Sequence, residues 1–509
     1  MQYLFYIKSN RKTNLEFGIQ NSDFLRGAEQ SEKYNKLYLN KSVKKLYNHF
    51  MANANTSDFE KVQFEKMINT PVSKLIISLA IPTIISMLVT AIYNMADTFF
   101  VSQINTEASA AVGIVFPIMS IIQACGFTLG MGGGSLVSRR LGERNDKEAT
   151  EISSTAFYTA FAIGLLIAIF GTLFAPFIIR LIGASETVLP YAKDYARYIF
   201  LGAPFMCTSF VLNNVLRSEG KAFFSMVALT SGGILNIILD PIFIYTMNLG
   251  ISGAAIATLI SQFISFLILL SWFLRRKTIC KISLKYFTHR AKIFFSIWGT
   301  GMPSLARQGL ASIATILLNT NAAVYGDSAV AAMSIVTKIV MFIASVMIGI
   351  GQGFTPVSGY NYGAKRFDRV KKAYWFTVFA GFSVMFVFAA VCFIFAPQIM
   401  KFFRNDIDVI QIGKIALRFQ VAVLPLHSLI VCTNMLMQST GQIKSATFLS
   451  CNRQGVYFIP LILILPRIFG LFGVEITQAI ADFFSVLTAI PYLIWFMRKL
   501  NKMQNQQTN

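Results

Sequence analysis

Residues 231–250 read SGGILNIILDPIFIYTMNLG, a stretch long and apolar enough to cross a membrane as one helix, with an acid in its middle. Asp240 follows Asn236 by one helical turn and directly precedes the helix-breaking Pro241. A carboxylate at that depth costs about 2.5 to 3.5 kcal/mol on insertion scales, so it is rarely present without a partner or a function. The second acid of this kind is Asp97, in AIYNMADTFFV. These stretches predict an all-α polytopic membrane protein with a polar site inside it.

The composition of the chain supports a membrane protein and argues against other classes. Of 509 residues, 55% are hydrophobic and only 13% are charged, against about 25% in soluble domains. The net charge of +22 does not indicate a nucleic-acid partner, because Lys and Arg lie in short connections between apolar runs and in the N-terminal tail. The six cysteines are scattered without a CxxC pair, which predicts small core residues and no disulfide or zinc framework.

Apolar runs of membrane-spanning length recur from Leu75 onward. Basic residues gather after the second, sixth and eighth runs and at the C-terminal end, whereas the alternate connections are nearly free of Lys and Arg. By the positive-inside rule we expect a multi-pass protein of the cell (inner or plasma) membrane with both termini cytoplasmic. Twelve runs are counted, centred near residues 88, 122, 165, 202, 235, 264, 308, 345, 383, 424, 455 and 485.

The first half of the chain aligns with the second when it is shifted, without gaps, so that Pro82 falls on Pro303. Under this repeat shift, matches between glycines and between prolines continue across six runs. We therefore expect two pseudo-symmetric six-helix bundles that enter the membrane the same way round, an arrangement that typically rocks about a central cavity. The expected parts are a polar, disordered cytoplasmic tail (1–66), an N-terminal lobe (67–275), a basic cytoplasmic linker (276–292), a C-terminal lobe (293–500) and a short tail (501–509).

The two acids belong to one copy of this repeat only. The repeat shift places Asp97 on Leu318 and Asp240 on Leu461, so the repeated fold does not itself require them. Burial favours the neutral form of a carboxyl group, which lets such an acid take up and release a proton near neutral pH. We therefore expect an ion-coupling site in the N-terminal lobe, with satisfied interhelical hydrogen bonds as the structural alternative. Carboxylate, amide and hydroxyl oxygens suit protons and sodium ions alike.

Several motifs surround these acids. They are YNMADTFFV at 93–101, GGGSLVSRRLGERN at 132–145, LRSEGK at 216–221, NIILDPIFI at 236–244 and LGISGAAIAT at 249–258, with Pro82 in the first run and weaker echoes in GQGFTPVSGYNYGA and MQSTGQ. Taken together they are specific, and the chain resembles the multidrug and toxic compound extrusion (MATE) family over about residues 67 to 500.

The resemblance implies a twelve-helix exporter in which lipophilic, often cationic, small molecules leave in exchange for entering protons or sodium ions. The pattern is closest to the DinF-like and MepA-like bacterial branch, whose N-terminal lobe holds the coupling ion. The acids of the NorM-like branch in the seventh and tenth runs are missing here. Carried over by position, the implied ion-coupling residues are Asp97, Tyr195, Asn236, Asp240 and Thr258, with Tyr191 and Tyr198 competing with Tyr195. If the ion is sodium, the implied metal ligands are Asp97, Asn236 and Asp240; no other cofactor is implied.

Pliable thioethers and aromatic faces suit varied apolar cations, and on this ground Asn94, Met95 and Met206 are predicted to line the substrate path. His427, in the tenth run, is expected to make an interhelical hydrogen bond, with proton relay as the alternative. Arg217 and Glu219 are expected to form a loop ion pair. Residues 132–134 lack the Lys-Ser/Thr of a phosphate-binding loop, so the three glycines predict close helix packing.

We interpret the sequence as a secondary active multidrug exporter that works by alternating access between two lobes, as a monomer surrounded by membrane lipid. A lipid-linked oligosaccharide flippase of the same superfamily is the alternative, although its cavity would be strongly cationic and the basic residues here lie mostly in loops. An enzyme is not expected, because the three histidines are far apart and lack metal-ligand spacing. A channel would need rings of charge that two buried acids do not supply.

Overall fold

The structure, a computed structural model, describes residues 56–508, which are almost entirely helical and contain no β-strand. Residues 62–509 form one compact unit, and residues 1–61 form another of which only residues 56–61 are described. Most of the tail predicted to be disordered, residues 1–55, therefore lies outside the described residues. Its last part, residues 56–66, lies in the helix α3 (Thr56–Asn69).

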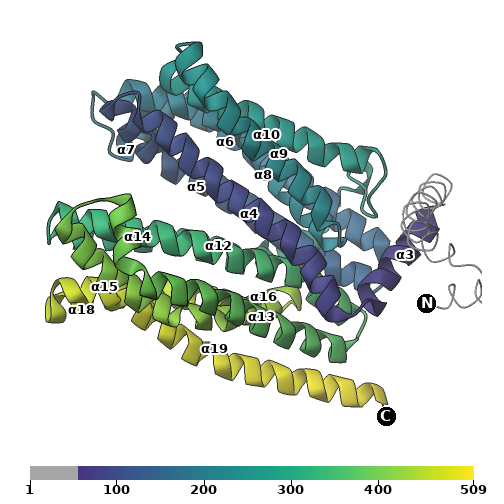
Figure 1. Ribbon diagram of the computed structural model, residues 1–509. Coiled ribbons are helices and arrows are strands. Elements are labelled where there is room, and N and C mark those ends of the chain that lie inside the picture. Colours follow the sequence, from purple (N-terminus) through teal and green to yellow (C-terminus); the bar gives the residue numbers. More distant parts are fainter. Residues whose placement is uncertain (1–55, 509) are drawn as a thin grey trace, which may run out of the picture. The chain divides into compact units, whose positions relative to one another are not determined.

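The N-terminal half of the larger unit contains six long helices that lie alongside one another (Figure 1). The fifth of them continues past Pro241 as one turn of π-helix, η1, so its hydrogen-bond pattern changes directly after Pro241 and two residues after Asp240. The long helices are α4 (Val72–Ser102), α5 (Thr106–Gly142), α6 (Asp146–Leu173), α8 (Leu189–Ser218), α9 (Ala222–Pro241) with η1 (Ile242–Thr246), and α10 (Gly250–Leu274), and a short α7 (Ala175–Leu181) follows α6.

The C-terminal half repeats this order with two interrupted helices. One span is broken by a 3-10 turn and another by a π-helical segment, η4. The elements are α11 (Ala291–Ala323), α12 (Asp327–Gly363), α13 (Phe367–Ile394), short α14 (Ala396–Phe403), α15 (Ile407–Val423) with η3 (Leu424–Leu426) and α16 (His427–Ser439), α17 (Ile443–Cys451) with η4 (Asn452–Phe458) and α18 (Ile459–Phe469), and α19 (Leu471–Thr508); the 3-10 turn η2 (Leu284–Tyr286) lies in the linker.

Eleven helical spans among the described residues are long and apolar enough to cross a membrane. The twelfth is α11, which has 33 residues but carries Arg307, Gln308 and several small polar residues, and so falls short in hydropathy only. All twelve predicted runs coincide with these helices, and the predicted all-α, twelve-span fold class is confirmed.

The internal repeat is visible in the details of the helix ends. The short helices α7 and α14 begin at Ala175 and Ala396, and the repeat shift places the first of these residues on the second. Gly220 and Gly441, also at equivalent positions, both have positive φ where α8 and α16 end. The two halves therefore share their turn geometry as well as their helix order.

Glycines allow the helices of the two halves to touch backbone to backbone. A Cβ atom added to Gly132 of α5 would collide with the Ile297 carbonyl oxygen of α11, and one added to Gly301 of α11 would collide with the Thr128 carbonyl oxygen of α5. The glycine run at 132–134 therefore packs helices closely, as predicted.

Residues 63–70, which are the second half of α3 and the residue after it, bridge both halves. The Gln63 side-chain amide donates to the Glu219 carbonyl oxygen at 2.5 Å, in the N-terminal half. From the C-terminal half, the Asn361 amide donates to the Met67 carbonyl oxygen at 3.3 Å, and the Arg369 guanidinium donates to the Thr70 carbonyl oxygen at 2.6 Å. This segment therefore fastens α8 to α12 and α13.

We expect Gly301→Ala to lower the thermal stability of the detergent-solubilised protein, because backbone atoms of α5 and α11 cannot move aside as a flexible side chain can. Overpacking of this kind costs about 1–3 kcal/mol. The matched control is Gly309→Ala on the same helix, whose added methyl group would meet no atom within 4 Å. Equal melting temperatures for the two variants would contradict this close contact.

Candidate functional site

Asp97 lies on α4 and is buried, with 8% of its surface exposed. Its Oδ2 atom accepts a hydrogen bond from the Tyr195 hydroxyl of α8 at 3.2 Å. The structure thus pairs Asp97 with Tyr195 rather than with the competing tyrosines: the Tyr191 hydroxyl instead accepts from the Asn105 amide, and Tyr198 is only half-buried. This pair ties the first helix of the lobe to the fourth.

Asp240 is fully buried on α9 and belongs to a second hydrogen-bonded group. The Asn236 amide, one turn earlier, donates to Asp240 Oδ1 at 3.0 Å and lies 3.3 Å from the Thr258 hydroxyl of α10. This group therefore joins the fifth helix to the sixth. The five residues that the resemblance implied for ion coupling fall into these two groups, and the carboxyl groups of Asp97 and Asp240 are close enough to interact electrostatically.

Four buried oxygen atoms in and beside these groups have no hydrogen-bond partner among the described residues. They are Asp97 Oδ1, Asn236 Oδ1, Asp240 Oδ2 and Ser261 Oγ. All four can accept or coordinate, which is the donor set that a hard cation or a proton requires. No group of three or more His, Cys, Asp or Glu side chains with metal-binding arrangement occurs in the part of the chain described. Four oxygen atoms without nitrogen or sulfur ligands fit a sodium ion or a proton better than a transition metal.

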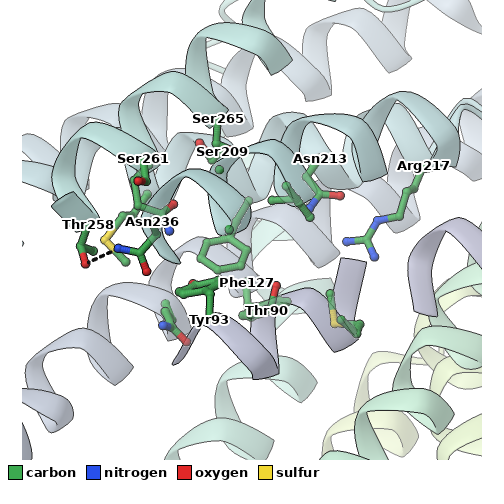
Figure 2. Close-up of a pocket in the computed structure, with 18 residues that line it drawn as sticks. Thr90, Tyr93, Phe127, Ser209, Asn213, Arg217, Asn236, Thr258, Ser261 and Ser265 are labelled. Atoms are coloured by element: carbon green, nitrogen blue, oxygen red, sulfur yellow. Dashed lines mark hydrogen bonds between the residues drawn. The ribbon is translucent and has the colours of Figure 1, made fainter. Parts of the chain in front are cut away.

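A cavity of about 90 Å³ opens beside Asn236 and Thr258, within the N-terminal half (Figure 2). Its wall is polar at several points, with Tyr93, Ser209, Asn213 and Ser261 among its lining residues. Pockets for drug-sized ligands usually measure about 300–1,000 Å³. The cavity in this conformation therefore has room for an ion and a few waters, and not for a drug.

The three residues predicted to line the substrate path are separated by the structure. Met206 is buried and lines the cavity. Asn94 and Met95 lie on the exposed part of α4, where Met95 is 49% exposed, and neither is a lining residue. They therefore face a different environment from Met206.

Arg217 lines the cavity at the opposite end from Thr258 (Figure 2). It is 4% exposed, donates to Asn214 Oδ1 at 3.1 Å, and also donates to the Gln352 side chain of α12 in the other half. The predicted loop ion pair between Arg217 and Glu219 is therefore wrong. The Glu219 carboxylate instead pairs with Lys221 at 2.7 Å, because it is held in the linker region by the backbone N–H groups of residues 279 and 280.

Sequence reasoning did not single out Tyr93 or Ser261, and it assigned Arg217 to a loop ion pair and not to the cavity. Tyr93 lies one turn before Asp97 in the YNMAD motif and interacts with it electrostatically. The repeat offered a signal for Arg217, since its equivalent in the second copy is Gln438 and the charge is again one-sided. His427 is buried, but its Nδ1 atom has no hydrogen-bond partner among the described residues, so the expected interhelical bond does not involve this atom.

Two segments of the chain, residues 82–242 and 303–464, match the MatE family model and together cover more than half of the sequence. The chain belongs to the MATE family. The matched segments begin at residues 82 and 303, the same pair that defines the repeat shift in the sequence. Asp97, Tyr195, Asn236 and Asp240 all fall in the first segment.

Individual members of the MATE family match over nearly their whole length. The multidrug export protein MepA of Staphylococcus saprophyticus is 28% identical over 442 residues, which is 86% of this chain and 96% of that protein. A crystal structure of MATE in complex with MaL6 is 30% identical with a TM-score of 0.82, covering 86% of this chain and 99% of the other. An outward-facing multidrug resistance MATE family transporter gives 30% identity and a TM-score of 0.82, covering 86% and 98%.

We expect Tyr195→Phe to destabilise the protein by about 1–3 kcal/mol, because Asp97 loses its hydroxyl donor while remaining buried. Thermal melting in detergent measures the loss. Tyr198→Phe on the same helix is the control, since the Tyr198 hydroxyl makes no hydrogen bond with any described residue. If Tyr195→Phe lowers the melting temperature no more than Tyr198→Phe does, the hydrogen bond to Asp97 does not stabilise the protein.

Proposed function

We propose that this protein is a secondary active multidrug exporter that expels lipophilic or cationic small molecules in exchange for protons or sodium ions. The observation that carries the proposal is the pair of acids in one lobe, Asp97 and Asp240, each buried and each with one carboxyl oxygen unpartnered among the described residues. The relatives named for multidrug export support the direction and the class of substrate.

The two acids supply a charge that an ion can switch. When both are ionised at close range in a medium of low dielectric constant they repel each other, and a bound proton or sodium ion removes the repulsion. If sodium is the ion, Asp97, Asn236 and Asp240 would hold it through their oxygen atoms. The ion thereby changes the preferred spacing of α4 and α9, which are in contact.

A moderate ion gradient is sufficient for this exchange. One elementary charge that crosses 100 mV releases about 2.3 kcal/mol, which supports a gradient of roughly fiftyfold for a neutral drug. When a monovalent cation leaves in exchange for one ion, no net charge crosses the membrane, and the concentration gradient of the ion supplies the energy instead. We infer that the two lobes rock about the α5–α11 contact, which opens the space between them to one side of the membrane at a time. Asn94, Met95 and Met206 are proposed as substrate-contacting residues.

The proposed setting is a monomer in the plasma membrane with both termini in the cytoplasm. An oligosaccharide flippase of the same superfamily is the second candidate. It would need a cationic central cavity, whereas the cavity within the N-terminal half has one cation, Arg217, in its lining and lies beside the Asn236–Asp240 pair. This distribution favours the export of cations.

We expect Asp97→Asn and Asp240→Asn each to abolish dye efflux driven by an imposed ion gradient, because an amide can neither exchange a proton nor balance the charge of a sodium ion. Efflux of a fluorescent cation from cells, normalised to the amount of protein in the membrane, is the measurement. Asp194→Asn is the control, because this acid is exposed and lies next to Tyr195. Normal efflux by both site variants would overturn the proposal.

The identity of the coupling ion is tested with purified protein in vesicles. A proton gradient and a sodium gradient are imposed separately on vesicles loaded with the dye. Transport under one gradient and not the other assigns the ion. Transport under neither, with protein correctly inserted, would contradict ion-coupled export.

A further inference from the structure

The C-terminal lobe has a charged cluster where the N-terminal lobe has its cavity. The repeat shift maps the cavity residues Met206, Gly232 and Ser261 onto His427, Arg453 and Asp482. It also maps Ser86, on the inner face of α4, onto Arg307 of α11. At these four positions the N-terminal lobe has a thioether, a glycine and two hydroxyls, whereas the C-terminal lobe has three basic side chains and one acid.

The acid of this cluster, Asp482, has hydrogen bonds to both of its carboxylate oxygens. Asp482 receives two hydrogen bonds from the Arg453 guanidinium, at 2.6 and 3.1 Å, and a third from the Gln478 amide at 2.7 Å. Asp482 is 6% exposed, so this forked pair is shielded from solvent. Arg453 and Asp482 neutralise each other and leave no negative charge for a second cation.

Arg307 is the remaining cation of the cluster. It is half-buried at the centre of α11, on the face it shares with the buried residues Ser304 and Ala314. It makes no hydrogen bond or ion pair with any described residue, and it lies close enough to the His427 imidazole to interact with it electrostatically. An unpaired guanidinium at this depth is costly, and such residues usually mark a substrate or ion pathway.

A lipid headgroup is a poor partner for this charge. The helix α11 has 33 residues, so Arg307 lies about 24 Å from either end at 1.5 Å per residue. A phospholipid phosphate lies at the membrane surface and not at this depth. The counter-charge is therefore expected from a molecule between the lobes. A simple anion would be repelled by the acids of the N-terminal lobe, whereas a molecule carrying both charges would be attracted by each lobe.

We propose that Arg307, together with His427, whose Nδ1 atom has no hydrogen-bond partner among the described residues, is an anion-binding subsite for the carboxylate of zwitterionic amphipathic substrates. The proposal rests on the proposed export function and specifies its substrate class. The guanidinium supplies a forked pair of donors that matches a carboxylate. The cationic end of the same molecule would lie toward the N-terminal lobe and its acids.

The test compares two forms of one fluorescent xanthene dye: the zwitterion with a free carboxylate, and its methyl ester, which is a cation. Binding of each dye to the purified protein is measured by fluorescence anisotropy, and this measurement does not depend on transport. Arg307→Gln is expected to weaken binding of the carboxylate dye about tenfold or more relative to the ester. Arg307→Lys keeps the positive charge but loses the forked pair of N–H donors, so it is expected to weaken binding of the carboxylate dye less than Arg307→Gln does. It replaces the glutamine variant in the test if that variant does not fold.

The matched control is Arg418→Gln, which removes a cation of the same lobe that stacks on Phe393 outside the cluster. It should leave the ratio of the two dissociation constants unchanged. An equal effect of Arg307→Gln on both dyes would overturn the subsite. Displacement of the carboxylate dye by phosphatidylglycerol in the wild type and not in Arg307→Gln would assign the site to lipid and overturn the substrate assignment. Failure of gradient-driven ester export in vesicles would instead count against the proposed function.

Discussion

The burial of two carboxyl groups in one lobe is the constraint on which the rest of the structure depends. Asp97 and Asp240 lie on contacting helices, and neither has a cationic partner among the described residues. Two like charges at close range in a low-dielectric interior destabilise the packing around them, so the lobe is stable only when a proton, a cation or a change in helix spacing relieves the repulsion. Under the proposed function, ion occupancy and helix geometry are therefore linked before any substrate is considered.

The helix α4 connects this constraint to the contact between the halves. Asp97 lies near its C-terminal end, whereas Ala80 and Ile84, near its N-terminal end, pack directly against Gly353 and Gly349 of α12. Pro82 lies between those two contacts, where it removes a backbone hydrogen bond. The backbones of α4 and α12 touch at these glycines, so neither helix can move toward the other there. A displacement of α4 near the acids therefore changes how α4 packs against α12. A close-packed contact of this kind has few alternative arrangements, which favours two discrete states.

The sequence was most informative where a residue type is costly in its setting. An acid in an apolar run is costly in a membrane and so indicated the site. Repeated prolines indicated the duplication, and basic connections between apolar runs indicated the membrane topology. The twelve spans and the two acids were therefore predictable from residues alone. Tyr195 was implied only by family resemblance, because a tyrosine is unremarkable in a membrane helix. The roles of Arg217 and Arg453 were not predicted, since their partners, Gln352 and Asp482, are distant in sequence and only tertiary packing brings them together.

The two lobes share one frame but bury different charged residues, and a π-helical turn lies beside one buried charge in each lobe. In the N-terminal lobe the π-helical turn η1 begins two residues after Asp240, and in the C-terminal lobe the π-helical segment η4 contains Arg453. A π-helical turn loosens the regular backbone ladder and is frequent at functional sites. These two turns do not occupy equivalent positions of the repeat, so the duplicated fold does not explain them, whereas proximity to a buried charge does. Asp240 lies two residues before one π-helical turn and Arg453 lies within the other, so a change in either charge acts where the backbone hydrogen-bond ladder is already irregular.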